Sequence, residues 1–501
     1  MSDCIFRAVM EWKGEIVYLG LDIGTSGVKA VVLDSAGKMV AQASASLPIS
    51  RPEASWSEQN ASDWWAATNK AVSNLDSQAR RQVRAIGLSG QMHGATLLDK
   101  QGQALRPAIL WNDGRAFAEC AELEAEVPNL AQISGNRAMP GFTAPKLRWV
   151  AKHEPQVFDK IAKVLLPKDY VRLRMTGEYA SDVSDSAGTL WLDVAKRDWS
   201  EELLSVCGLS REQMPALHEG PQVTGNIRTE LAEAWGMAAV PVIAGGGDNA
   251  AGAVGVGVVG EGEAFLSLGT SGVLFVANDG YRPNPAGGVH CFCHALPDRW
   301  HQMSVILSAA SCMDWAAKLT GQTNAMSLFD KVAGAGHLTG NEIFLPYLSG
   351  ERTPHNNPNA RGVLFGLDHD SDPAKIGRAV LEGVAFAFRD GMDALKSAGS
   401  SIDNVTVIGG GSQSKFWGSM LANILEMPMV YREGGEVGPA FGAARLAQLG
   451  MEDGDIASVC HPSAIVEVIE PDHRISEQLL AKLPTYRSIY SNLEHLFGEH
   501  N

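Results

Sequence analysis

Short runs of apolar residues that end in glycine recur along the chain, and two of them are nearly identical. Residues 18–31 read YLGLDIGTSGVKAV and residues 263–276 read EAFLSLGTSGVLFV, so the shared Gly-Thr-Ser-Gly returns after 245 residues, about half of the chain. In each copy an apolar run leads into a glycine-bounded turn and a second apolar run, which is the pattern of a β-hairpin. A repeat at half-length predicts two similarly built domains whose hairpin loops face one cleft. A chance match of common loop residues is the alternative.

The rest of the pattern favours a mixed α/β protein. Residues 83–90 (VRAIGLSG) and 405–411 (VTVIGGG) are typical of strands that run into glycine loops. Apolar and small residues at helical spacing predict helices over 62–75, 414–425 and 439–449. Strands that alternate with helices in this way indicate an α/β fold.

The second hairpin marks the expected domain boundary. The glycine-rich segment 256–262 (VGVVGEG) comes just before it, so we expect a first domain over 16–258 and a second over 259–501. Residues 1–15 precede the first strand, and we expect them to form a flexible N-terminal extension.

Composition and charge narrow the class of protein. Apolar residues make up 45% of the chain and charged residues 20%, which is ordinary for a globular protein. The formal net charge of −16 argues against nucleic-acid binding, because phosphate contacts need clustered Lys and Arg. Seven cysteines without a CxxC pair indicate free thiols in a reducing compartment. The N-terminus lacks the pattern of a signal peptide, and the least polar window, 237–260, has Asp248 at its centre, so we expect a soluble, cytoplasmic protein without a membrane helix.

Asp22 lies directly before the first Gly-Thr-Ser-Gly turn and is a candidate metal ligand. The N–H groups of such a turn can cradle phosphate oxygens, and Mg²⁺ commonly bridges phosphates to one or two carboxylates. The second copy has Ser267 at the equivalent position. Two turns lined by N–H groups, with one carboxylate, are what a metal–triphosphate site needs. An aspartate that caps its own turn is the alternative.

Asp248 follows three glycines in GGGDNAAG, residues 245–252, at an expected junction of loop and helix. A carboxylate there suits a general base, which must come within hydrogen-bond reach of the hydroxyl that receives a phosphoryl group. A helix N-cap is the alternative. The two roles are compatible because a carboxylate has two oxygens.

A third glycine cluster, GGGS at 409–412, offers a surface without side chains against which a nucleotide can lie. It does not fit the GxGxxG pattern of dinucleotide-binding proteins, and the chain has no GxxxxGK[ST] motif. The sequence therefore argues against a Rossmann dehydrogenase and a P-loop kinase.

Polar loops supply candidates for binding a small polyhydroxylated substrate. SGQMHG (89–94) carries Gln91 and His93, and WNDGR (111–115) concentrates Trp, Asn, Asp and Arg. Aromatic faces suit sugar C–H groups, and Asp and Arg can share hydrogen bonds with hydroxyls. For His93, a purely structural role is the alternative. HCFCH (290–294) looks like metal ligands, but strand alternation separates its cysteines from its histidines and zinc motifs space cysteines more widely, so we expect no metal site there.

These features together resemble the FGGY family of carbohydrate kinases, within the actin-like superfamily. GFTAPKLRWVAKH (141–153) is similar to one family signature, and GVLFGLDHDSDPAKIGRAVLEG (362–383) is similar to the second, with Lys375 where an acid or amide is more usual. Longer shared stretches, such as QMHGATLLD, GGGDNAAGAVGVG, LSLGTSGV and FLPYLSGERTPHNNP, extend the resemblance over the whole chain.

The resemblance implies two actin-like, ribonuclease-H-like domains with a central cleft, the first (16–258) binding sugar and the second (259–501) binding ATP. It implies ATP-dependent phosphorylation of a ketopentose, D-xylulose, in xylose catabolism, with Mg²⁺ as the metal and a homodimer as the assembly. It implies Asp248 as the catalytic base and Asp22 as the metal ligand. The implied sugar contacts are Met92, His93, Asp248 and Asn249. The implied ATP contacts are Thr25, Ser26, Gly269, Thr270, Ser271, Gly410, Gly411 and Ser412.

Two alternatives stay open on the sequence alone. An actin-like ATP-driven switch without sugar chemistry would have the same hairpins and glycine loops. A kinase for another ketopentose or polyol, such as L-ribulose, glycerol or gluconate, would have similar polar loops, because pentose epimers differ only in the direction of one hydroxyl.

Overall fold

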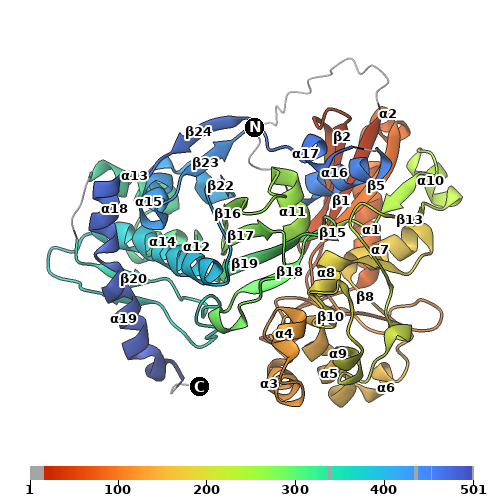
Figure 1. Cartoon of the computed structure of the whole chain (residues 1–501), viewed down its shortest axis with the longest axis horizontal. Helices are drawn as coiled ribbons and strands as arrows, with labels where there is room; N and C mark the ends of the chain where they lie inside the picture. The colour runs from red at the N-terminus through yellow and green to blue at the C-terminus, as the bar shows by residue number, and fades with distance from the viewer. Residues whose placement is uncertain (1–15, 337–339, 434–437, 453, 499–501) are drawn as a thin grey trace.

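The computed structural model describes residues 16–336, 340–433, 438–452 and 454–498, which form two lobes side by side (Figure 1). Each lobe is built around one seven-stranded sheet with parallel and antiparallel neighbours. The extension predicted over 1–15 lies outside the described residues. The predicted α/β class is confirmed.

The first sheet belongs to the first half of the chain. Its strands lie in the order β13 (Val223–Asn226), β14 (Pro241–Ile243), β5 (Val83–Gly90), β1 (Val17–Ile23), β2 (Gly27–Asp34) and β3 (Met39–Ser46), with β15 (Gly246–Gly247) also paired to β5.

The second sheet belongs to the second half. Its strands lie in the order β18 (His290–Cys293), β19 (Trp300–Ile306), β17 (Gly272–Asn278), β16 (Ala264–Leu268), β22 (Val405–Ile408), β23 (Met429–Arg432) and β24 (Ile465–Ile469). The run β3-β2-β1-β5-β14 of the first sheet corresponds to β19-β17-β16-β22-β23 of the second, with antiparallel and parallel pairs in the same places. The internal repeat is therefore a repeat of topology.

The two Gly-Thr-Ser-Gly segments form the predicted hairpin turns. Strands β1 and β2 pair antiparallel around the first turn, where the Gly24 N–H donates to the Gly27 carbonyl at 3.0 Å. Strands β16 and β17 pair around the second, where the Gly269 N–H donates to the Ser271 carbonyl at 3.1 Å. These strands are buried on both faces, so their sequences are continuous apolar runs rather than alternating patterns.

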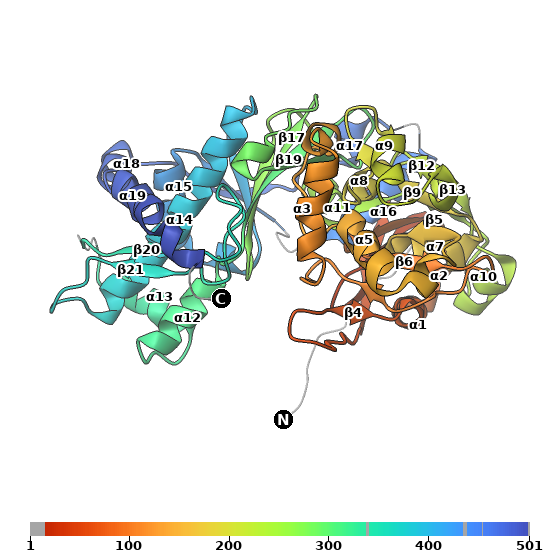
Figure 2. The ribbon, with the colours of Figure 1, turned by 90° about the horizontal axis from the view of Figure 1, so that it is seen from below.

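Helices cover the sheets and fill the space beside them (Figure 2). Those of the first half are α1 (Ala61–Ser73), α2 (Ser77–Arg81), α3 (Phe117–Glu126), α4 (Leu130–Ser134), α5 (Thr143–His153), α6 (Pro155–Phe158), α7 (Pro167–Thr176), α8 (Val183–Ala187), α9 (Glu201–Ser205), α10 (Thr229–Trp235) and α11 (Asp248–Val256). Those of the second half are α12 (Ser311–Leu319), α13 (Ala325–Gly334), α14 (Pro373–Ser397), α15 (Lys415–Leu425), α16 (Pro439–Met451), α17 (Ile456–Val459), α18 (His473–Leu480) and α19 (Leu483–Leu493).

Short strand pairs complete the two lobes. They are β4 (Glu58–Gln59) with β7 (Ala108–Ile109), β6 (Thr96–Leu98) with β8 (Lys163–Leu165), β9 (Ala180–Asp182) with β12 (Ala216–His218), β10 (Leu192–Asp193) with β11 (Asp198–Trp199), and β20 (Ile343–Leu345) with β21 (Val363–Phe365). The helices predicted over 62–75, 414–425 and 439–449 are confirmed as α1, α15 and α16.

Helix α16 comes late in the chain but packs on the first sheet, against β1 and β5, and against α11 (Figure 1). Glycines make this close approach possible. A Cβ added at Gly20 or Gly87, which are neighbours on β1 and β5, would lie 1.8 Å from a carbonyl oxygen of α16, and one added at Gly442 would lie 1.7 Å from a carbonyl oxygen of α11. The division predicted between residues 258 and 259 falls between α11 and β16, so the second predicted segment also supplies a helix to the first sheet.

Within the described residues, no helix combines the length and the apolar character that crossing a membrane requires. The cysteines among them, Cys120, Cys207, Cys291, Cys293, Cys312 and Cys460, are all buried free thiols, as predicted.

Candidate active site

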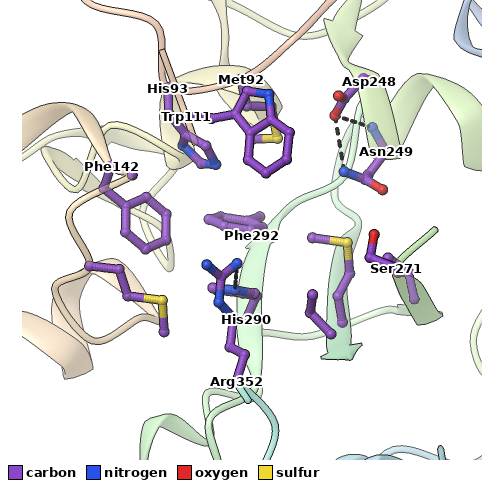
Figure 3. A pocket seen from close by; sticks show the side chains of 15 residues that line it. Met92, His93, Trp111, Phe142, Asp248, Asn249, Ser271, His290, Phe292 and Arg352 are labelled. Carbon is purple, nitrogen blue, oxygen red and sulfur yellow. Dashed lines mark hydrogen bonds between the residues drawn. The ribbon is translucent and has the colours of Figure 1, made fainter. Parts of the chain in front are cut away.

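A cavity of about 240 Å³ lies between the two lobes, with walls from both halves of the chain (Figure 3). Most of its walls are apolar or aromatic, and its charged lining residues are one carboxylate and one guanidinium. The first half contributes Met92, His93, Trp111, Met139, Gly141, Phe142, Asp248 and Asn249. The second half contributes Ser271, Val273, His290, Phe292, Met303, Val305 and Arg352.

Asp248 is the first residue of α11 and directly follows β15. Its Oδ1 accepts hydrogen bonds from the main-chain N–H and from Nδ2 of Asn249, at 2.7 and 3.0 Å. Burial raises the pKa of Asp248 to about 6, although these hydrogen bonds oppose the rise. The N-cap of α11 is Gly247, so the interpretation of Asp248 as the cap is wrong. The carboxylate has the exposure to the cavity and the raised pKa that a general base near neutral pH requires.

Met92 and His93 lie together on the loop after β5, and both line the cavity. His93 adopts a positive φ of 69°, and its Nδ1 lies 2.6 Å from the Gly188 carbonyl. Because a carbonyl only accepts, Nδ1 carries the proton and donates to it, which leaves Nε2 as an acceptor. Burial lowers the pKa of His93 to about 3, so the ring is neutral. A neutral imidazole in the cavity wall, with Nε2 as an acceptor, can accept a hydrogen bond from a hydroxyl.

Asp22 lies near the end of β1, paired with Ser89 on β5 and Lys29 on β2. Its Oδ1 is buried and has no hydrogen-bond partner among the described residues. Burial and the neighbouring Asp248 carboxylate raise the pKa of Asp22 to about 7. A buried carboxylate oxygen without a partner, beside a second carboxylate, is disfavoured until a cation compensates it. The chemistry of these two groups therefore fits Mg²⁺, which prefers oxygen ligands.

The first turn is connected to the cavity through a chain of hydrogen bonds. Thr25 Oγ1 donates to Gln91 Oε1 at 3.0 Å and accepts from Trp111 Nε1 at 3.0 Å. Gln91 is buried and does not line the cavity, because its side chain bonds to Thr25 and Gln59 instead. Ser26, next to Thr25, is exposed.

The second turn and the third glycine cluster adjoin one another. Ser271 lines the cavity directly, and Thr270 is exposed beside it. The backbone of Gly409 and Gly411 lies against Leu268, the last residue of β16 before the turn. Gly269, Gly410 and Ser412 do not line the cavity, so the third cluster and the rest of the turn form a surface beside it.

The WNDGR segment contributes only its tryptophan to the cavity. Arg115 is buried, pairs with Asp113 at 2.7 Å and with Glu58 at 2.7 Å, and stacks on Trp56. The expectation that Asp113 and Arg115 share sugar hydroxyls is therefore wrong, since both are used in the interior of the first lobe.

No sequence pattern pointed to several of the cavity residues, among them Phe142, Met139, Met303 and Arg352. His290 and Phe292 lie in the HCFCH segment, whose pattern suggested a metal site rather than a cavity wall. In β18 these two side chains alternate with the cysteines and line the cavity, as the predicted strand alternation requires. Among the described residues, no group of three or more His, Cys, Asp or Glu is arranged to hold a metal ion.

Comparison with known proteins places the chain in a family. The model of the N-terminal domain of the FGGY family of carbohydrate kinases matches residues 17–255, and the model of the C-terminal domain matches 264–451. The chain is 59% identical to the xylulose kinase of Escherichia coli K12 over 434 residues, 86% of this chain and 90% of that one. It is 53% identical to the xylulose kinase of Klebsiella pneumoniae over 484 residues, 96% of this chain and all of that one.

The fold agrees with these matches. The crystal structure of a xyloylose kinase from Brucella ovis matches with a TM-score of 0.92 and 49% identity, over 96% of this chain and all of that one. The two family models cover most of the chain, and the two relatives are 59% and 53% identical to it over most of its length. The chain therefore belongs to the FGGY family of carbohydrate kinases.

Proposed function

We propose that this protein transfers the γ-phosphoryl group of ATP to the 5-hydroxyl of D-xylulose and so forms D-xylulose 5-phosphate in xylose catabolism. The observation that carries the proposal is Asp248, a carboxylate with a pKa raised to about 6 in the wall of a cavity shared by both lobes. The choice of sugar is supported by the two relatives above 50% identity that are xylulose kinases.

Asp248 acts as the general base. It takes the proton of the 5-hydroxyl as the bond between that oxygen and the γ-phosphorus forms and the bond to the bridging oxygen of ADP breaks. Nε2 of His93 accepts a hydrogen bond from another sugar hydroxyl. Phe142 and Phe292 offer flat faces to the C–H groups of the sugar.

ATP binds with its phosphates beside the two hairpin turns and the third glycine cluster. Asp22 would hold Mg²⁺, and the metal would supply positive charge beside the phosphates. The proposed ATP contacts are Thr25, Ser26, Gly269, Thr270, Ser271, Gly410, Gly411 and Ser412. Closure of the two domains, 16–258 and 259–501, on the sugar excludes water and limits ATP hydrolysis. From the resemblance to the family, we further propose that the protein is cytoplasmic and acts as a homodimer.

The test is ADP release by the purified protein with Mg²⁺ATP, with D-xylulose, L-ribulose, glycerol or gluconate, and without sugar. We expect a rate that rises sharply with D-xylulose alone. The same rate with and without every sugar would mean an actin-like ATPase, and a larger rate with another acceptor would replace D-xylulose.

The base is tested with Asp248→Asn, which keeps shape and hydrogen bonding but cannot take a proton. We expect turnover to fall by roughly 10²–10⁴-fold, while the calorimetric dissociation constants for D-xylulose and MgATP stay close to those of wild type, because the ground-state contacts are kept. Near-normal turnover would refute this role of Asp248.

A further inference from the structure

Arg352 is a cation inside the cavity that the proposed chemistry has not used. Its side chain lines the cavity, and among the described residues no carboxylate lies within ion-pair distance of its guanidinium. Among the described residues, its side-chain partner is His290, whose Nε2 lies 3.4 Å from a guanidinium nitrogen. Burial lowers the pKa of Arg352, yet an arginine stays charged under these conditions. Several N–H donors are therefore available to a ligand.

The partner of Arg352 has a defined protonation state. Asn136 Nδ2 donates to the carbonyls of Ser134 and Cys291, each at 2.9 Å, which fixes the amide orientation and makes Oδ1 an acceptor. Nδ1 of His290, 2.8 Å from that oxygen, must then carry the proton. Burial and the Arg352 charge hold the pKa of His290 well below its usual range, so the ring is neutral and Nε2 accepts from Arg352. The guanidinium is oriented without being neutralised.

The backbone around Arg352 is held firmly. Glu351 Oε1 accepts from the N–H of Arg352 at 2.7 Å and from the N–H of Leu307 at 3.1 Å. The next residue, Thr353, bonds to both polar main-chain groups of Val305 on β19, through its N–H at 3.1 Å and its Oγ1 at 3.0 Å. The position of Arg352 is therefore set by the second sheet before any ligand arrives, which lowers the entropic cost of binding.

The cavity has two chemically different sides. Asp248 and Arg352 stand on opposite sides of it, with Phe292 between them (Figure 3). Since His93 and His290 are neutral, these two are the charged groups of the lining. A carboxylate accepts from a hydroxyl, whereas a guanidinium donates to oxygen acceptors. A matching ligand presents a hydroxyl at one end and electron-rich acceptors at the other.

We propose that Arg352, oriented by His290 and Asn136, binds the C1–C2 hydroxyketone end of the open-chain sugar and selects a ketose over the polyol with the same carbon skeleton. The proposal rests on the proposed function, which places the 5-hydroxyl at Asp248 and hence C1 and C2 at the far side. The keto oxygen accepts two hydrogen bonds and donates none, so it suits the donor-only guanidinium. In a polyol a hydroxyl replaces it and is the weaker acceptor.

The experiment compares wild type with Arg352→Met and Arg352→Lys, using D-xylulose, xylitol and xylonate. For Arg352→Met we expect the dissociation constant of D-xylulose to rise by roughly 10–100-fold, as befits loss of hydrogen bonds from a charged donor. That of xylitol should change much less, because the hydroxyl that replaces the keto oxygen is the weaker acceptor for Arg352. Arg352→Lys should restore part of the preference, because it keeps the charge but loses the planar fork. Arg282→Met, whose guanidinium bonds to Glu261 and Asn278 outside the cavity, is the matched control.

Three results would overturn the proposal. An equal loss of affinity for D-xylulose and xylitol would mean that Arg352 lines the cavity without distinguishing the two ligands. A higher KM for MgATP, or a fall in kcat at unchanged sugar binding, would assign it to the phosphoryl group. Tighter binding of xylonate than of D-xylulose by wild type would assign it to a carboxylate. If Arg352→Met does not fold, the Lys variant carries the same comparison. A wild type that releases no ADP with any sugar would instead refute the proposed function.

Discussion

The main-chain N–H of Gly247 donates a hydrogen bond of 3.1 Å to the hydroxyl of Ser184 and so ties the residue before Asp248 to helix α8. Ser184 in turn donates to Asp182 Oδ1 at 2.5 Å, and Asp182 pairs with Lys168 at 2.7 Å. The side chains of Lys168 and Asp182 are completely buried. The start of α11 is thus attached to an ionic cluster in the interior of the first lobe, which holds the candidate base in place.

Ser184→Ala should therefore impair catalysis as well as stability. The Gly247 N–H loses its partner, which costs about 1–3 kcal/mol when the group stays buried, and the looser junction should lower kcat roughly tenfold through misplacement of Asp248. Ser186→Ala is the control, because Ser186 lies on the same helix and bonds to Ser181 instead. Steady-state kinetics and thermal unfolding of both variants decide the point, and equal kcat values would refute the positioning role.

The pH dependence of turnover should follow Asp248. A base must be ionised, and the pKa of this carboxyl is raised to about 6, so kcat/KM for the sugar should fall about tenfold for each pH unit below 6. His93, with a pKa near 3, does not contribute in this range. The pKa of Asp22 is raised to about 7 without metal, but bound Mg²⁺ would keep this carboxylate ionised, which is why the metal must be saturating. The profile is best measured between about pH 5 and pH 8, which extends about 1 unit below and about 2 units above the pKa of Asp248, at saturating Mg²⁺. A flat profile in wild type, or the same slope in Asp248→Asn, would contradict this assignment.

Asp22→Asn should stabilise the metal-free protein while impairing the proposed metal site. The pKa of Asp22 is raised from 3.8 to about 7, so the folded, metal-free protein holds a disfavoured carboxylate. This destabilisation is complete above pH 7 and decreases progressively as the pH falls from 7 towards 3.8. In EDTA at pH 8 the variant should melt several degrees higher than wild type, as about 1–2 kcal/mol would produce. Asp370→Asn, at an exposed position, should melt like wild type.

The same Asp22→Asn protein also tests the metal site. Mg²⁺ATP should raise the melting temperature of wild type but have a much smaller effect on the variant, because the proposed metal ligand is gone. Equal stabilisation of both proteins would remove Asp22 from the metal site.

Gly87→Ala should be strongly destabilising, because the new Cβ would lie 1.8 Å from the Ala443 carbonyl oxygen of α16. Neither main-chain segment can yield without separating α16 from the sheet, so we expect a loss of about 1–3 kcal/mol or more. Gly334→Ala, in α13, has open space around its Cβ and should be tolerated or slightly stabilising. Thermal unfolding distinguishes the two, and similar melting temperatures would refute this account of α16.

Local pattern was enough to predict the elements that carry the site. Both hairpins, the strand of 83–90 and the helix after Gly247 follow from apolar runs punctuated by glycine, which are patterns within each segment itself. The position of Asp248 at the junction of β15 and α11 follows in the same way. Periodicity and turn chemistry act over a few residues, so a single sequence contains them.

The direction in which an individual side chain points could not be predicted without the tertiary structure. Trp111 faces the cavity while Asp113 and Arg115, two and four residues later, pair inside the lobe. This difference depends on Glu58 and Trp56, which come from a distant segment of the chain.

The α/β class, the internal repeat and the candidate base could be predicted from the sequence, because apolar periodicity and glycine turns are local properties. Only the folded chain reveals that α16 packs on the first sheet and that Arg352, on a loop of the second lobe, faces Asp248 across one cavity. These relations arise from pairing between segments more than 100 residues apart, which no local pattern specifies.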